Sequence, residues 1–358
     1  MSVELLRLNE LLALARGREA SDLHAGAGSA PALRIDGRPV ALDAPPFAAA
    51  TLESFLESVL SAGGLQQWQT TRCADTARRS GTGAPYRLHA YATLTGTRLA
   101  FRFLRAEIPA LEELALPPAL IALATRPAGL IVFTGPTGSG KTTALAALID
   151  RINRTSERVI VTIEDPVEYV HQPLRSVVAH CEIGRDAADY AGAIRGFMRS
   201  DPDVILVGEM RDRSTMEAAL SAAETGHLVV STLHTADAAQ TIDRIIDAFG
   251  SESQSQVRTQ LASTLLAVVA LRLVPRRNGH GRVAAAEVLV GTDAVRAMIR
   301  EGKTHQLRNA IATGRAGGMR TLETALSDLV VRGTISLDAA RRAAARPGDV
   351  RDLERVAM

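Results

Sequence analysis

A glycine-rich segment, GPTGSGKT at residues 135–142, constrains the fold of this chain more than any other feature of its sequence. It matches the pattern GxxxxGK[ST], in which consecutive backbone N–H groups surround a phosphate at the start of a helix. The apolar run LIVF at 130–133 precedes the segment, and a stretch with helical spacing, 142–152, follows it. Because strand, loop and helix occur in the order that the pattern requires, the segment predicts a nucleotide-binding site.

The residue types in this loop predict particular roles. Gly138 and Gly140 allow the backbone to curl around a phosphate, Lys141 would bridge the β- and γ-phosphates of ATP, and Thr142 would bind Mg²⁺. The residues of the loop that we expect to contact ATP are Gly135, Pro136, Thr137, Gly138, Ser139, Gly140, Lys141, Thr142 and Thr143.

The rest of the central region has the pattern of an α/β fold. Short apolar runs alternate with helical segments; they lie at 130–133, 159–163, 204–207 and 228–233. Unbroken apolar strands between helices are typical of a parallel sheet that helices cover on both faces. We therefore expect a P-loop core, a parallel sheet between helices, over residues 119–290.

The flanking regions have different patterns. Residues 1–104 combine helical spacing near the start with strands that alternate around Asp36-Gly37 and Gly96, which predicts a small α+β domain. Three prolines make residues 105–118 a predicted linker. Residues 291–358 have helical spacing almost throughout, and we expect a helical C-terminal region there.

Carboxylates and histidines follow the apolar strands of the core. Glu164 and Asp165 end one strand, where Glu164 is a candidate to orient or deprotonate an attacking water. Glu209 ends another, and we expect it to hold Mg²⁺ through water. His227 and His234 flank a third strand; either could be structural, or could sense the γ-phosphate.

Composition excludes several classes of protein. The net charge of +2 and the aromatic content of 3% argue against nucleic acid as a partner. Cys73 and Cys181 are too far apart for a CxxC pair, which excludes a zinc ribbon. The longest apolar run, 261–274, is shorter than a membrane span and contains Arg272. Together with the acidic Glu4 near the start, these features predict a cytoplasmic protein.

The four boxes, in this order and spacing, resemble those of the type II secretion and type IV pilus ATPases. The Walker A, Asp, Walker B and His boxes of that superfamily match residues 135–142, 163–168, 204–212 and 225–234. The segment AVRAMIREGK at 294–303 is similar to the AIRNLIRE element of its PilT-type pilus retraction ATPases, the twitching motility proteins. The absence of a four-cysteine zinc insert and of a further N-terminal domain also favours that branch.

This resemblance implies a fold and a set of further residues. The fold would be a PAS-like N-terminal domain and a RecA-like ATPase core, assembled as a homohexamer, with ATP between the two domains. An arginine of the first domain would close onto phosphate, and the candidates are Arg87, Arg98 and Arg102. Glu164 would be the catalytic acid, with Lys141, Glu209 and His234 beside it. The element at 294–301 would contribute Arg296 and Arg300.

The resemblance also implies partners. ATP hydrolysis would rotate domains against an inner-membrane platform protein and return pilin subunits to the membrane, with the motor bound peripherally at the pilus base. The alternatives are an extension or secretion motor, a regulatory subunit with little turnover, and a nucleic-acid translocase. Val295 and Ala297-Met298 depart from the retraction element, which leaves an accessory paralogue open as well.

Overall fold

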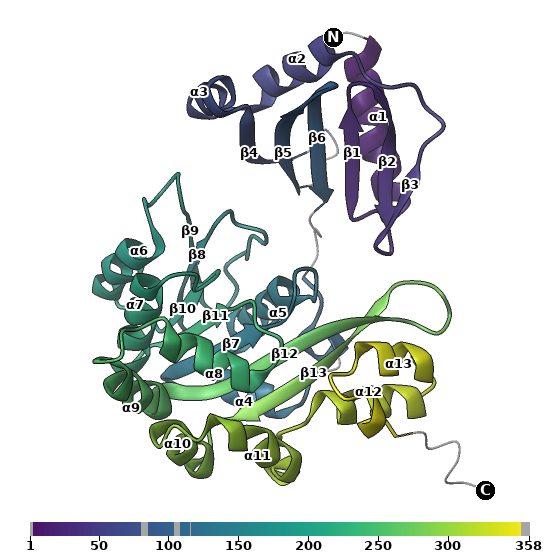
Figure 1. The fold of residues 1–358 in the computed structure, drawn as a ribbon. Helices are drawn as coiled ribbons and strands as arrows, with labels where there is room; N and C mark the ends of the chain where they lie inside the picture. Colours follow the sequence, from purple (N-terminus) through teal and green to yellow (C-terminus); the bar gives the residue numbers. More distant parts are fainter. Residues whose placement is uncertain (1–2, 80–84, 104–107, 115, 352–358) are drawn as a thin grey trace, which may run out of the picture. The chain divides into compact units, whose positions relative to one another are not determined.

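A computed structural model describes residues 3–79, 85–103, 108–114 and 116–351 of the 358-residue chain. The chain forms two compact units, Met1–Glu107 and Ile108–Met358, and each is described by itself (Figure 1). In the segment expected as a linker, the short 3₁₀ helix Leu111–Leu114 lies in the second unit, and Leu111 is buried beside α5 (Lys141–Thr155). Residues 104–107 and 115 of that segment lie outside the described residues.

The first unit is an antiparallel sheet with helices against one face. The strand order is β3-β2-β1-β6-β5-β4. The strands are β1 (Asp22–Gly26), β2 (Ser29–Ile35), β3 (Arg38–Ala41), β4 (Cys73–Arg79), β5 (Pro85–Thr93) and β6 (Gly96–Phe103). The helices are α1 (Val3–Gly17), α2 (Ala49–Val59) and α3 (Ala62–Thr71). The predicted α+β pattern is therefore present in this unit.

Alternation along the strands explains the two faces of this sheet. In β6, Leu99 and Phe101 are buried in the core with Leu56 of α2, whereas Arg98 and Arg102 point to the other face. Asp36, with φ of +47°, and Gly37, with φ of +83°, make the predicted tight turn between β2 and β3.

The second unit is built on a seven-stranded sheet with the order β13-β12-β7-β11-β10-β8-β9. Its strands are β7 (Gly129–Thr134), β8 (Val159–Glu164), β9 (Val177–Glu182), β10 (Val204–Val207), β11 (Leu228–Thr232), β12 (Leu265–Pro275) and β13 (Arg282–Val290). All neighbouring strands are parallel except β12 and β13, which form an antiparallel hairpin. The predicted α/β fold with a parallel sheet is confirmed.

Helices cover both faces of this sheet. They are α4 (Ala119–Ala124), α5 (Lys141–Thr155), α6 (Tyr190–Phe197), α7 (Arg213–Glu224), α8 (Ala238–Asp247), α9 (Gln254–Thr264), α10 (Asp293–Arg300), α11 (Leu307–Thr313), α12 (Leu322–Val331) and α13 (Leu337–Ala343). Among the described residues, no helix is both long and apolar enough to cross a bilayer.

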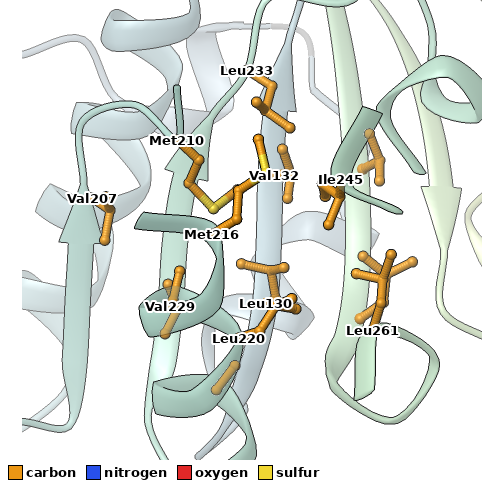
Figure 2. Close-up of a cluster of buried hydrophobic side chains, with 14 of the residues drawn as sticks. Leu130, Val132, Val207, Met210, Met216, Leu220, Val229, Leu233, Ile245 and Leu261 are labelled. Atoms are coloured by element: carbon orange, nitrogen blue, oxygen red, sulfur yellow. The ribbon is translucent and has the colours of Figure 1, made fainter. Parts of the chain in front are cut away.

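The central strand β7 contributes to two separate cores. Leu130 and Val132 pack with Met216 and Leu220 of α7 (Figure 2), whereas Ile131 and Phe133 pack with α5 on the opposite face. Because every side chain of β7 is buried, the loop that follows it leaves the sheet from a rigid position.

One strand of this sheet differs from the sequence pattern. The sequence does not predict β9, because apart from the buried Cys181 its residues are exposed or partly buried and form no long apolar run. The loop after Pro275 joins β12 to β13, and all its residues are exposed. A small core around Leu326 and Ile335 packs α12 and α13 on the outer part of this hairpin.

Candidate nucleotide-binding site

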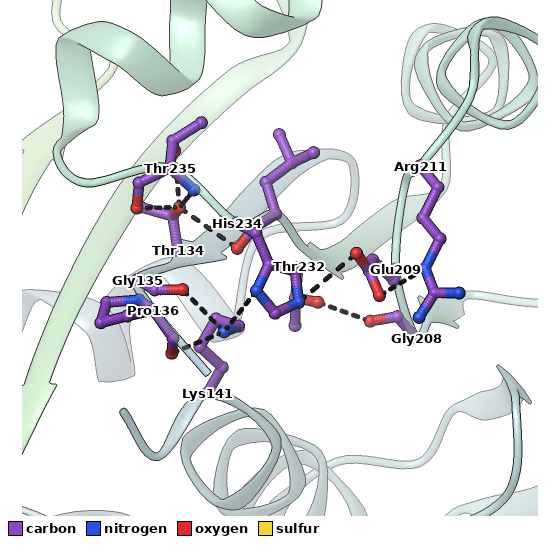
Figure 3. A network of polar contacts seen from close by, with 11 residues as sticks. Thr134, Gly135, Pro136, Lys141, Gly208, Glu209, Arg211, Thr232, His234 and Thr235 are labelled. Carbon is purple, nitrogen blue, oxygen red and sulfur yellow. Dashed lines mark hydrogen bonds and ion pairs between the residues drawn. The ribbon is translucent and has the colours of Figure 1, made fainter. Parts of the chain in front are cut away.

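Four parallel strands bring the predicted polar residues to one edge of the second sheet. β7, β8, β10 and β11 end at the glycine-rich loop, Glu164, Gly208-Glu209 and His234, respectively. The carboxyl ends of parallel strands are where ligands bind in open α/β sheets. Figure 3 shows the central part of this edge, with Lys141, His234 and Glu209 in line.

The loop after β7 requires glycine at its first position. The backbone of Gly135 has φ of +136°, and a Cβ there would lie 2.7 Å from Ser139 Oγ and closer still to the Leu271 carbonyl oxygen. Gly140, with φ of +94°, is the N-cap of α5. The loop therefore curls back on itself and exposes Pro136, Thr137 and Gly138, at the N-terminus of a helix where anions bind.

Lys141 is held inside this loop. Its side chain is only 7% exposed, and Nζ donates to the carbonyl oxygens of Gly135 at 2.7 Å and Pro136 at 3.1 Å. Burial lowers the pKa of Lys141, although the negative charges of Glu209 and Glu168 oppose that shift. A buried ammonium whose short hydrogen bonds go to neutral carbonyls is well placed to exchange these partners for phosphate oxygens.

A chain of contacts joins Lys141 to the acid of the Walker B box. His234 Nδ1 lies 3.5 Å from Lys141 Nζ, and His234 Nε2 lies 3.4 Å from Glu209 Oε1. Arg211 Nε donates to the other carboxylate oxygen of Glu209 at 2.8 Å. The imidazole thus lies between the lysine and the glutamate and contacts both of them.

A tyrosine explains why glycine precedes this glutamate. A Cβ on Gly208 would lie 3.2 Å from Tyr190 Oη and 3.3 Å from the Ile163 carbonyl oxygen, closer than most real contacts. Thr232 Oγ1 donates to the Gly208 carbonyl oxygen at 2.7 Å and ties the ends of β10 and β11 together. A side chain at position 208 would therefore force Tyr190 or the end of the strand to shift.

Glu164 ends β8 in a buried position, 7% exposed. The Glu168 N–H points at Glu164 Oε2 from 3.4 Å, and the Val167 N–H donates to Glu182 Oε2 at 3.1 Å. Asp165, the next residue, is exposed. Burial, and next the charge of Asp165, raise the pKa of the neighbouring Tyr190, so this phenol stays protonated.

Threonines connect the strand before the loop to the strand before His234. The Thr235 N–H donates to Thr134 Oγ1 at 2.9 Å, and the hydroxyls of Thr134 and Thr235 lie 2.6 Å apart. The Thr235 hydroxyl in turn contacts Thr241 Oγ1 of α8 at 2.6 Å. This network fixes the backbone on either side of His234 relative to the glycine-rich loop.

The residues present fit a nucleotide with Mg²⁺. Thr142, in the first turn of α5, and Glu209 supply the hydroxyl and carboxylate oxygens that Mg²⁺ prefers. The buried hydroxyl of Ser139 has no hydrogen-bond partner within the described part of the chain, and the loop around it has the curled shape of a phosphate cradle. Thr143 Oγ1 contacts Tyr169 Oη at 3.1 Å and braces the start of the same helix.

Three predicted residues of the second unit lie at the opposite end of the sheet. His227 comes just before β11, where Nδ1 lies 2.9 Å from the Ala222 carbonyl oxygen. Arg296 Nε donates to the Gly291 carbonyl oxygen at 2.9 Å, next to the start of β12. Arg300 is exposed at the last turn of α10. The structure does not bring these side chains to the glycine-rich loop.

The three candidate arginines lie together on the first unit. Arg87, Arg98 and Arg102 share the face of the sheet that the core does not occupy. Arg98 donates to Ser29 Oγ at 2.9 Å, and Arg102 forms an ion pair with the buried Asp22 at 3.0 Å.

Sequence reasoning missed three side chains at the site. Arg211 is two residues after Glu209, so its place in the Walker B box was the available signal. Tyr169 and Tyr190 come from a loop and a helix outside all four boxes, and no pattern marks them.

Comparison with known proteins agrees with this geometry. The model of the type II/IV secretion system protein family matches residues 85–352, which is most of the chain. The chain belongs to this family. Its match includes every strand of the second sheet and all four boxes, together with β5 and β6 of the first unit.

Relatives within the family align over nearly the full chain. The type IV pilus retraction ATPase PilT of Pseudomonas aeruginosa is 40% identical over 95% of this chain and 98% of its own length. A twitching motility protein of Neisseria gonorrhoeae is 41% identical over 88% of this chain and 84% of its own length. A crystal structure of the pilus retraction motor PilT with bound ADP has a TM-score of 0.85 and 40% identity, and the match covers 97% of this chain and 98% of that one.

Proposed function

We propose that this chain is an ATPase whose hydrolysis of ATP drives retraction of a type IV pilus. The observation that carries the proposal is the line of contacts from Lys141 through His234 to Glu209, at the edge of the sheet where the glycine-rich loop begins α5. Membership of the secretion ATPase family, and the similarity to a retraction ATPase over nearly the whole chain, support the same activity.

Each residue of the site has a part in the proposed reaction. Lys141 exchanges its carbonyl partners for β- and γ-phosphate oxygens, and its charge offsets the negative charge that develops as the γ-phosphoryl group leaves. Glu164 orients the attacking water and accepts its proton. His234 contacts the γ-phosphate. When that phosphate leaves, the ring changes its contact with Glu209.

Mg²⁺, held by Thr142 and through water by Glu209, would neutralise charge on the phosphates. The remaining loop residues, Gly135 to Ser139, would bind phosphate oxygens through their backbone N–H groups, except at Pro136, which has none. Arg87, Arg98 and Arg102 remain the candidates for an arginine that closes onto phosphate.

The proposed assembly is a homohexamer that works in the cytoplasm at the base of the pilus. Its partner would be the inner-membrane platform protein, through which it would return pilin to the membrane. The helix α10, which carries Arg300 on an exposed position and anchors Arg296 to the backbone, is a candidate element for coupling to retraction. The nearly balanced charge of the chain argues against a nucleic-acid partner.

Deletion of the gene tests the direction of the motor. A retraction motor predicts cells that carry more pili than the parent and do not twitch. Cells without pili would instead identify an extension or secretion motor. A purified chain that binds ATP without releasing phosphate would identify a regulatory subunit.

A further inference from the structure

A second cluster of chemically active side chains lies in the first unit, outside the nucleotide-binding site. It consists of Cys73 and Asp75 on β4 and His89 on β5. One donor atom from each residue lies within 4.8 Å of the others. We propose that these residues form a binding site for a transition-metal dication of the zinc class.

The strand register explains why the three residues meet. Asp75 lies directly opposite His89 in the antiparallel pair of β4 and β5, and Cys73 precedes Asp75 by two positions. Because side chains alternate along a strand, Cys73 and Asp75 point to the same face as His89. Ala74 and Leu88, the neighbours on the other face, are buried in the core, so the backbone under the cluster is held firmly.

The hydrogen bonds around His89 prepare it to act as a metal ligand. Nδ1 of the ring lies 2.9 Å from Asp75 Oδ1, while Nε2 lies 4.0 Å from Cys73 Sγ. A carboxylate on one ring nitrogen fixes the tautomer and makes the other nitrogen a better donor to a metal. The ring also stacks on Tyr91, with centroids 5.4 Å apart and an interplanar angle of 23°, which limits its rotation.

The spacing of sulfur and nitrogen suits an ion between them. Tetrahedral Zn²⁺ with bonds of about 2.3 Å to sulfur and about 2.0 Å to nitrogen brings these two atoms to roughly 3.5 Å. The thiol therefore has to move by only about half an ångström from its position 4.0 Å from Nε2. Thiolate and imidazole favour zinc-class ions over Mg²⁺. The cluster therefore differs in metal preference from the oxygen ligands at Thr142 and Glu209.

Partial exposure makes the cluster accessible and leaves positions for water. The side chains of His89 and Asp75 are 44% and 74% exposed, and Cys73 is partly buried. Cys73 and His89 are the ligands, and Asp75 positions His89. Water or an additional donor fills the remaining coordination positions of the ion. The other cysteine, Cys181, is 2% exposed in the core of the second unit, and it provides an internal control.

Cobalt binding tests the proposal without reference to ATPase activity. The untagged, reduced full chain is titrated with Co²⁺ in excess Mg²⁺ and without nucleotide, and then with Zn²⁺. We expect one equivalent of Co²⁺ with a near-ultraviolet sulfur-to-cobalt charge-transfer band, which Zn²⁺ abolishes. Cys73→Ser loses the band, and Cys73→Ser and His89→Gln each weaken Zn²⁺ binding at least tenfold. Asp75→Asn keeps the band at saturation and weakens binding about ten- to a hundredfold.

Two control variants separate this cluster from other metal donors. Cys181→Ser retains the band, and His280→Ala, on an exposed loop, retains the wild-type affinity for Zn²⁺. Circular dichroism confirms that each variant is folded. A wild-type chain with no charge-transfer band would overturn the proposal, and so would a band that survives Cys73→Ser.

Discussion

His234 Nε2 lies 3.4 Å from Glu209 Oε1, so the end of β11 and the end of β10 meet through one imidazole and one carboxylate. The same ring reaches Lys141 Nζ at 3.5 Å through its other nitrogen. His234 therefore contacts both Lys141, which we expect to bind phosphate, and Glu209, which we expect to hold Mg²⁺ through water.

Replacement of His234 by alanine tests this bridge. Because the glycine-rich loop and Lys141 remain, we expect the affinity for Mg-ATP to change by less than about threefold, whereas kcat falls by at least about tenfold. His227→Ala is the matched control, since that histidine lies at the other end of β11 and its loss should leave kcat unchanged. Equal kcat values for His234→Ala and the wild type would remove His234 from the mechanism.

Replacement of Gly135 by alanine tests the shape of the loop. The new methyl group would press against Ser139 and the Leu271 carbonyl, in a backbone conformation that alanine rarely adopts. We expect a loss of about 1–3 kcal/mol in the free energy of unfolding, measured by urea denaturation, and weaker ATP binding.

Gly184→Ala is the control for that experiment. Gly184 also has a positive φ, +82°, but nothing lies within 4 Å of a Cβ there. Gly184→Ala should therefore lower the free energy of unfolding only through its strained backbone conformation, and its ATP affinity should stay unchanged. Unchanged ATP affinity in Gly135→Ala would show that the loop tolerates the methyl group.

Gly208 and Tyr190 are expected to act as a pair. Gly208→Ala would push the chain away from Tyr190 Oη and move Glu209, so kcat should fall. Tyr190→Phe removes the hydroxyl and should restore part of kcat in the double variant. Steady-state kinetics of the three variants provides the double-mutant cycle. Strictly additive losses would show that the two residues are independent.

Protonation of His171 is expected to destabilise the chain at low pH. Burial, and next the neighbouring His180, lower the pKa of His171 from 6.5 to about 4. Between these values the unfolded chain binds the proton and the folded chain does not, so stability falls as the pH drops from 6.5 towards 4. This contribution amounts to about 2 kcal/mol at pH 5.

Urea denaturation at pH 8 and pH 5 measures this effect. The difference in unfolding free energy between the two pH values should be smaller by about 2 kcal/mol in His171→Gln than in the wild type. His305→Gln, which replaces an exposed histidine on a short 3₁₀ helix, is the control. A pH difference that is the same in His171→Gln and the wild type would contradict the assignment.

The sequence predicts the central sheet well where strands are buried on both sides. β7, β8, β10 and β11 are largely apolar runs, which are typical of strands in a parallel sheet that helices cover on both faces. β9 lacks this signal because it lies at the edge of the sheet, where Val177 and Ala179 are exposed.

Tertiary packing explains what the sequence leaves out of the site. The motif pattern names Lys141, Glu209 and His234, but it does not show that the His234 imidazole contacts the other two, because the distance between strand ends depends on strand order. Tyr190 reaches Gly208 only because α6 packs beside the end of β8, and periodicity does not encode that packing.

Phosphate release by the purified chain tests the central claim most directly, in the wild type, Glu164→Gln and Lys141→Ala. With Mg-ATP, we expect steady hydrolysis by the wild type and a kcat at least about a hundredfold lower in Glu164→Gln, which should still bind nucleotide. Lys141→Ala should lose nucleotide binding itself. Wild-type turnover in Glu164→Gln, or no phosphate release by the wild type, would contradict the account.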